Sequence, residues 1–109
     1  MIPPRVALEL LLTAEPLSAA RAYEIGLVNR VVPSDQLVQT TQEIAVRIAS
    51  NAPLSVRAGK AMVYATADMG RLEALDHADR LFEPVYLSED AQEGPQAFKE
   101  RRPPQWRGR

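Results

Sequence analysis

The side chains that could take part in acid–base chemistry are few in this sequence of 109 residues. Glu89, Asp90 and Glu93 stand close enough together to suggest a pair of carboxylates that share general acid and base roles. They directly follow Ser88, however, which is a good helix N-cap, and acidic residues in the first turn of a helix are stabilised by the helix dipole. We therefore interpret this cluster as a solvated helix start and not as a catalytic pair.

The other reactive residue types form no recognisable constellation. His77 is the only histidine and there are no cysteines, so the sequence offers no zinc site of the cysteine type and no second imidazole to share a metal. Ser18 and Ser34 precede expected helices, where capping explains a hydroxyl better than nucleophilic attack does. We predict no catalytic residue and no metal ligand in this chain.

The elements that position these residues are predicted to be helices. Apolar residues recur at helical spacing in most of the chain, and we expect helices from Pro4 to the break at Pro16, over 19–25, 35–50, 53–66 and 69–87, and again from Ser88. Residues 27–32 are β-branched and extended in character. The predicted fold class is all-α, with five to six helices and one short extended segment.

Local signals also predict how the helices begin and stop. Ser18 is the expected N-cap of the second helix, and Gly26 its left-handed stop. Asp68 is expected to cap the fifth helix, and Pro84 to kink that helix or end it early. Gly94 and Pro95 should interrupt the last segment, so that a short final helix runs from Pro95 to about Arg102.

The first helix is apolar nearly all round from Val6 to Leu12, with Glu9 as the exception. A helix with such a surface is expected to be buried, so we infer that either the rest of the chain or other material covers it.

Composition excludes several classes of partner. The net charge is -1, with 46% hydrophobic and 25% charged residues, which favours neither nucleic acid nor an anionic membrane surface. No segment approaches the roughly 20 apolar residues that cross a bilayer. The lack of cysteine fits a reducing compartment, and we expect a cytoplasmic location. The basic residues that cluster near the end are interpreted as a solvated tail: Lys99, Arg101, Arg102, Arg107 and Arg109.

Three segments carry ordered sequence patterns. The first spans residues 7–33 and contains Leu12-Thr13-Ala14, Gly26-Leu27-Val28-Asn29 and Val31-Val32-Pro33. The second is Ala52-Pro53-Leu54 followed by Lys60, and the third is Ser88-Glu89-Asp90 followed by Glu93-Gly94, Ala97-Phe98, Glu100, Arg102 and Pro104. Together they resemble the enoyl-CoA hydratase/isomerase (crotonase) family. Ala14 replaces the glycine usual in that family, so a left-handed turn there would be slightly strained, and Arg101 replaces a common lysine.

The resemblance implies that residues 1–109 form the C-terminal helical domain of a crotonase-like fold. The family's N-terminal ββα spiral core, with its oxyanion-hole N–H groups and catalytic glutamates, is then absent from this sequence. The resemblance also implies a coenzyme A thioester as substrate and no cofactor. It places Phe98 against the adenine and Arg101 against the phosphates of coenzyme A. A core-anchor role for Phe98 and simple solvation of Arg101 remain alternatives, and Lys60 is expected to be structural.

Two functions follow as expectations. In the first, the chain is part of an acyl-CoA hydratase or isomerase of fatty acid metabolism, inactive by itself, that contributes trimer or hexamer contacts and part of the coenzyme A pocket. In the second, it is a non-catalytic helical module for oligomerisation or interaction. The sequence decides neither the acyl chain nor the choice between hydration and isomerisation.

Overall fold

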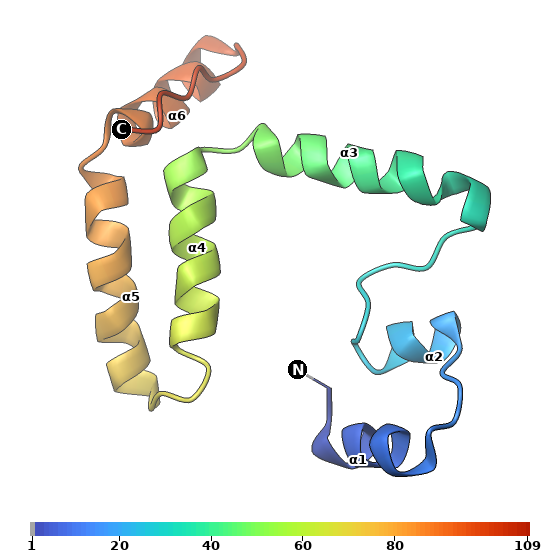
Figure 1. The fold of residues 1–109 in the computed structure, drawn as a ribbon. Coiled ribbons are helices and arrows are strands. Elements are labelled where there is room, and N and C mark those ends of the chain that lie inside the picture. Colours follow the sequence, from blue (N-terminus) through green and yellow to red (C-terminus); the bar gives the residue numbers. More distant parts are fainter. Residues whose placement is uncertain (1) are drawn as a thin grey trace. The chain divides into compact units, whose positions relative to one another are not determined.

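The computed structural model describes residues 2–109, and the chain forms two compact units, Met1–Gln42 and Glu43–Arg109. Within residues 2–109 the structure contains six α-helices, one 3-10 turn and no strand (Figure 1). The elements in order are α1 (Pro4–Thr13), α2 (Ala19–Glu24), the 3-10 turn η1 (Ser34–Gln36), α3 (Leu37–Ala49), α4 (Pro53–Ala65), α5 (Arg71–Tyr86) and α6 (Glu89–Glu100). The all-α prediction is confirmed, and residues 27–32 form a non-helical connection. None of the described helices combines the length and apolar character that crossing a membrane requires.

The turn after α1 takes the conformation that the family resemblance implies. Ala14 is left-handed, with a φ of 53°, and its N–H donates to the main-chain oxygen of Leu10 at 3.1 Å. The Thr13 hydroxyl donates to the main-chain oxygen of Glu9 at 2.8 Å and accepts from the N–H of Glu15 at 3.3 Å. An alanine in this region is strained relative to glycine, so the predicted strain at Ala14 is present.

The ends of α2 also match the local signals. The Ser18 hydroxyl accepts a hydrogen bond from the N–H of Arg21 at 3.1 Å, as expected of an N-cap. Gly26 is left-handed, with a φ of 74°. The N–H groups of Leu27 and Val28 then both donate to the main-chain oxygen of Ala22, which satisfies a carbonyl at the end of the helix. The predicted N-cap and the predicted stop of α2 are therefore both confirmed.

The rest of the chain does not bury the first helix, so of the two predicted covers only other material stays a prediction. No residue of α1 is buried, and Leu11 and Leu12 are 79% and 81% exposed. Within its unit the neighbouring helix is α2, which has six residues against ten in α1. So short a helix cannot cover a surface that is apolar nearly all round, and α1 keeps its leucines in solvent.

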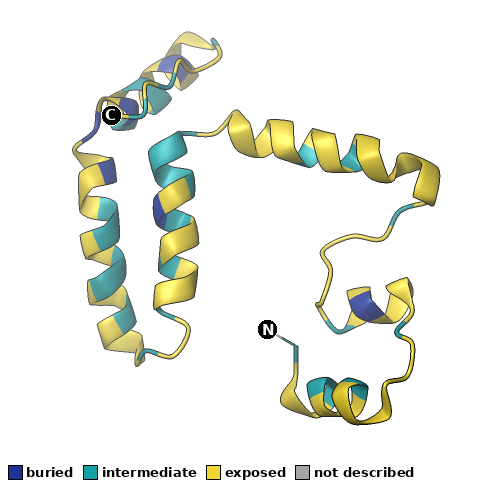
Figure 2. Cartoon of the chain, viewed as in Figure 1, coloured by how far each residue is buried: buried dark blue, intermediate teal, exposed yellow. Residues whose placement is uncertain are grey.

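The second unit is built on a helical hairpin. The helices α4 and α5 pack side by side in antiparallel directions, joined by residues 66–70, and α6 packs against α5 (Figure 1). The buried apolar residues that the structure describes in this unit are Ala58, Val85 and Ala97, with Ala22 in the other unit (Figure 2). The buried apolar side chains are therefore small ones.

Local signals failed at one cap and at two prolines. The N-cap of α5 is Gly70 and not Asp68, and α5 continues past Pro84 to Tyr86, so Pro84 does not end it early. The last segment is one continuous helix with Pro95 inside it, where the sequence predicts an interruption. A proline removes one backbone hydrogen bond, and in α6 contacts on both sides of Pro95 offset that loss. The Ser88 hydroxyl, which accepts from the N–H of Ala91 at 3.2 Å, secures the start of this helix.

Candidate functional site

The first turn of α6 holds the polypeptide that follows the helix. Asp90 is only 4% exposed, and its two carboxylate oxygens accept hydrogen bonds from the main-chain N–H groups of Arg107, at 2.7 Å, and Gly108, at 2.9 Å. The N–H of Glu89 donates to the main-chain oxygen of Arg109 at 2.8 Å. The interpretation of this acidic cluster as a solvated helix start is therefore wrong for Asp90, because its charge is satisfied by N–H donors 17 and 18 positions away.

Glu93 forms a second anchor one turn further along α6. Its carboxylate accepts hydrogen bonds from both terminal nitrogens of the Arg102 guanidinium, which makes a two-pronged ion pair. It also accepts a hydrogen bond from the main-chain N–H of Gln105 at 2.6 Å. The hydrogen bonds from Arg102 and from the Gln105 main chain lower the pKa of Glu93 to about 2. The same pairing with Glu93, and then with Glu100, raises the pKa of Arg102. The Arg102 guanidinium is thus occupied by ion pairs within the chain.

Two further basic side chains of the tail are paired as well. Arg107 and Arg109 lie 3.1 Å and 3.2 Å from the carboxylate oxygens of Glu89. More than half of each of these side chains is exposed, so these two pairs contribute little stability. The interpretation of the basic tail as solvated is therefore wrong for Arg102, which is half-buried and paired with Glu93 and Glu100, and it holds for the exposed Arg107 and Arg109.

Trp106 supplies the third anchor. Its indole lies over Gly94, where a Cβ atom would stand 3.4 Å from Cη2 of the ring. Its Nε1 donates to the main-chain oxygen of Ser50 at 2.8 Å. No role was assigned to Trp106 from the sequence alone. The available signal was the complementarity between the acids at 89–93 and the arginines at 102–109.

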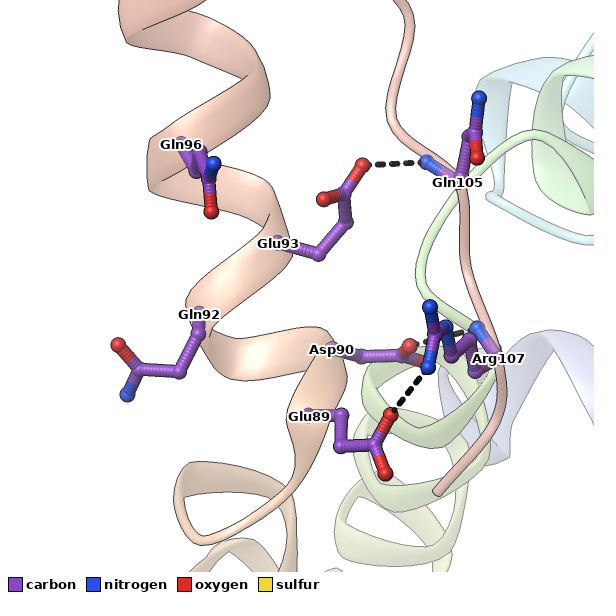
Figure 3. Close-up of a pocket in the computed structure, with 7 residues that line it drawn as sticks. All are labelled: Glu89, Asp90, Gln92, Glu93, Gln96, Gln105 and Arg107. Atoms are coloured by element: carbon purple, nitrogen blue, oxygen red, sulfur yellow. Dashed lines mark hydrogen bonds and ion pairs between the residues drawn. The ribbon is translucent and has the colours of Figure 1, made fainter.

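A pocket of about 250 Å³ lies between α6 and the tail (Figure 3). Figure 3 shows Glu89, Asp90 and Glu93 directed toward the tail, with Gln92 pointing away from it. The lining is polar and contains three carboxylates against one guanidinium. An acidic pocket whose carboxylates already accept hydrogen bonds from the tail repels phosphate, so it is structural and does not fit a polyanionic ligand.

Phe98 lies in the last turn of α6, at its opposite end, and Arg101 directly follows the helix. Phe98 is 87% exposed, so its alternative role as a core anchor is wrong. Arg101 is exposed, and no hydrogen bond or ion pair within residues 2–109 involves its guanidinium. The N–H of Arg101 donates to the main-chain oxygen of Phe98 at 3.2 Å. The structure therefore brings an accessible aromatic face and an unpaired guanidinium to one turn.

Arg101 is also left-handed, with a φ of 54°. The N–H of Arg102 donates to the main-chain oxygen of Ala97 at 3.1 Å, and with the bond from Arg101 to Phe98 this completes a Schellman motif. Glycine is the usual residue at this position, because a side chain costs about 1–2 kcal/mol there. An arginine in so unfavourable a conformation is a candidate for a role other than helix termination.

The other residues singled out from the sequence lie elsewhere. Lys60 is exposed on α4, and His77 is half-buried on α5 next to the Asp76–Arg80 ion pair of 2.6 Å. Within residues 2–109 no group of three or more histidine, aspartate or glutamate side chains is placed to hold a metal ion.

Known proteins resemble this chain along its whole length. The sequence pattern of the enoyl-CoA hydratase/isomerase family matches residues 1–109. Carnitinyl-CoA dehydratase of Salmonella typhi is 37% identical over 113 residues, which cover 100% of this chain and 43% of that protein. An enoyl-CoA hydratase/isomerase from Mycobacterium paratuberculosis, of known structure, is 40% identical, with a TM-score of 0.93 over 99% of this chain and 43% of the other.

The structure of enoyl-CoA hydratase from Mycobacterium tuberculosis H37Rv gives a similar result, with 36% identity and a TM-score of 0.93 over 99% of this chain. The chain spans about 43% of the length of these relatives. The likeness in sequence and in fold extends over the same residues, and it includes the helix that carries Phe98 and Arg101. The chain belongs to the enoyl-CoA hydratase/isomerase family.

Proposed function

We propose that this chain is the helical, substrate-binding portion of an acyl-CoA enzyme and that Phe98 and Arg101 form an edge of its coenzyme A site. The observation that carries the proposal is the last turn of α6, where an 87% exposed phenylalanine adjoins an arginine without a partner inside residues 2–109. The names of the relatives, carnitinyl-CoA dehydratase and enoyl-CoA hydratase, support a coenzyme A thioester as the ligand.

The chemistry of the two side chains suits the two ends of the coenzyme A nucleotide. An exposed phenylalanine ring can stack on adenine, as aromatic side chains stack on bases in general. A guanidinium pairs with phosphate through two parallel N–H donors and keeps its charge at any physiological pH. In this proposal the residues described bind the ligand and make or break no bond, and the reaction needs no cofactor beyond the thioester itself.

A second candidate function is supported by a different observation. Large apolar side chains stay exposed on several helices, among them Leu11, Leu12 and Leu72. Large apolar side chains in solvent are stabilised when another protein surface covers them. In this candidate the chain is a non-catalytic helical module that associates with further copies, as a trimer or hexamer. The two candidates are compatible, since assembly and coenzyme A binding use different residues.

Titration of the ¹⁵N-labelled chain with coenzyme A, followed by amide NMR, tests the first proposal. Shifts should concentrate at Phe98, Arg101 and their neighbours. Phe98→Ala and Arg101→Gly should each weaken binding about tenfold, because a hydrogen bond to a charged group contributes roughly 1.5–3 kcal/mol and a stacked base a similar amount. Arg80→Ala, which removes an exposed arginine on α5, is the matched control and should leave binding unchanged.

Light scattering of the same samples separates the candidates. A mass that rises with concentration, together with no coenzyme A shift at Phe98 or Arg101, favours the association module alone. Shifts spread evenly over the exposed arginines would argue against a specific coenzyme A edge, because that pattern indicates general anion attraction.

A further inference from the structure

Two adjacent arginines follow α6, and they differ in their side-chain partners. Arg102 uses both terminal nitrogens on Glu93 and its Nε on Glu100. Arg101 has no such partner within residues 2–109. A phosphate that approached this end of the helix would therefore have to break an existing ion pair to reach Arg102, whereas Arg101 is available at once. The ligand role falls to Arg101 because Arg102 is already occupied.

The unfavourable backbone conformation of Arg101 needs a restraint. Two main-chain hydrogen bonds hold the turn at Arg101. The N–H of Arg101 donates to the main-chain oxygen of Phe98, and the N–H of Arg102 donates to the main-chain oxygen of Ala97. If Arg102 moved, the second of these bonds would open and Arg101 could relax to a more favourable φ. Keeping Arg102 in place thus keeps Arg101 left-handed.

The restraint on Arg102 comes from Glu93. The Glu93 side chain is 18% exposed and projects from the helix that ends at Arg101, so it joins the body of α6 to the residue just beyond the turn. Glu93 also accepts the N–H of Gln105, which anchors the chain on the far side of Pro103 and Pro104. The turn is consequently tied down on both sides of Arg101.

We infer that Glu93 and Arg102 are positioning residues, whose ion pair holds Arg101 in the left-handed turn and so keeps its guanidinium beside Phe98 for a coenzyme A phosphate. The ligand part of this inference rests on the function proposed above for Arg101. The low pKa of Glu93 supports it, since the carboxylate stays charged from neutral pH down to strongly acidic solution. The ion pair therefore holds the turn over that whole pH range.

The test compares Glu93→Gln with Asp90→Asn in the full 109-residue chain. Glu93→Gln removes the charge that holds Arg102, whereas Asp90→Asn disturbs the tail at Arg107 and Gly108 and leaves the pair intact. The coupling between the amide and α protons of Arg101 reports its φ by NMR. Binding of coenzyme A is titrated in the same samples, at a temperature where circular dichroism shows every variant to be folded.

Glu93→Gln should change the Arg101 coupling and weaken coenzyme A binding by roughly five- to thirtyfold, the ratio by which a side chain avoids the left-handed region. Asp90→Asn should change neither. If Glu93→Gln does not fold, Arg102→Lys replaces it, because lysine keeps the charge but cannot form the two-pronged pair. It should shift the same two readouts in the same direction.

The possible results distinguish failure of the positioning role from failure of the proposed coenzyme A edge. If coenzyme A binds through Arg101 and Glu93→Gln changes neither the coupling nor the affinity, the positioning role is overturned and the binding edge stands. If coenzyme A does not bind the native chain, the binding edge fails, and the Arg101 coupling still decides whether Glu93 holds the turn. Equal effects of Glu93→Gln and Asp90→Asn on both readouts would overturn the positioning role, since they indicate general loosening of the tail.

Discussion

The indole Nε1 of Trp106 donates a hydrogen bond of 2.8 Å to the main-chain oxygen of Ser50, which lies 56 positions earlier in the sequence. Ser50 directly follows α3, and carbonyls at the end of a helix have no donor within the helix. The tail of the chain thus satisfies a carbonyl that the helix itself leaves open. This bond ties the end of α3 to the tail that lies along α6.

Replacing Trp106 with phenylalanine tests this tie. Trp106→Phe keeps an aromatic ring over Gly94 but removes the N–H donor. We expect the free energy of unfolding to fall by about 1 kcal/mol, the usual contribution of one hydrogen bond, with a further loss from the smaller ring. Thermal unfolding followed by circular dichroism measures it. Tyr64→Phe, at an exposed site on α4, is the control, and an equal melting temperature for Trp106→Phe and the native chain would contradict the role of the bond.

The left-handed turn after α1 gives a prediction of the opposite sign. Ala14→Gly should raise the free energy of unfolding by roughly 0.5–1 kcal/mol, because glycine adopts a φ of 53° without strain. The greater flexibility of glycine in the unfolded chain offsets only part of this stabilisation. Ala7→Gly, inside α1, should lower the free energy of unfolding by about 1 kcal/mol. Urea titration of both variants checks the contrast. A loss of stability in both would show that the turn at Ala14 is not left-handed in solution.

Arg101→Gly should separate stability from binding. Glycine relieves the strain at a φ of 54°, so the free energy of unfolding should rise by up to about 1 kcal/mol. Coenzyme A binding should fall in the same variant. Calorimetric melting and ligand titration on one sample measure both quantities. A variant that is less stable than the native chain would mean that the guanidinium has a structural partner, in conflict with its exposed, unpaired state.

Asp90 is predicted to hold the tail more firmly than the exposed ion pairs do. Asp90→Ala leaves the N–H groups of Arg107 and Gly108 without their acceptor, which should lower the free energy of unfolding by about 1–3 kcal/mol. Amide hydrogen exchange at these two residues should accelerate. Glu89→Ala removes only surface pairs with Arg107 and Arg109 and should change stability by less than about 1 kcal/mol. Similar losses in the two variants would contradict this ranking.

The ion pair of Glu93 predicts how stability depends on pH. The pKa of Glu93 is about 2 in the folded chain against an ordinary value of 4.5, so the folded state binds its proton less readily than the unfolded state does. The stabilisation from this group is therefore complete above about pH 4.5 and is lost as the pH falls from there through 2. Melting temperatures measured across this range should fall less steeply in Glu93→Gln. Parallel pH profiles for the variant and the native chain would exclude this pair as the source.

The features that sequence reasoning obtained are local ones. Ser18 and Ser88 cap their helices and Gly26 is left-handed, because each signal depends on residues within one turn. The left-handed turn at Ala14 was instead implied by the family resemblance. The predicted interruption of the helix at Pro95 was wrong for a related reason. The local rule counts the lost backbone bond and omits the tail contacts that stabilise both halves of α6.

The features that sequence reasoning missed depend on distant partners. Asp90 and Arg107 are 17 positions apart, and nothing in the spacing of either shows that they meet. The exposure of Phe98 likewise depends on which face of α6 the tail covers. The resemblance already pointed to Arg101, but the reason why Arg101 and not Arg102 is the available cation required the position of Glu93.

The small size of the buried residues has a consequence for how the chain unfolds. Among residues 2–109 the buried apolar side chains are three alanines and one valine, and none of the larger ones is fully enclosed. Unfolding then brings little new apolar surface into water, and both the heat-capacity increment and the sensitivity to denaturant scale with that surface. Melting of the chain by itself should be gradual and weakly cooperative. A surface that covers the leucines of α1 would sharpen the transition and raise its midpoint by mass action, so that folding and association become a single event.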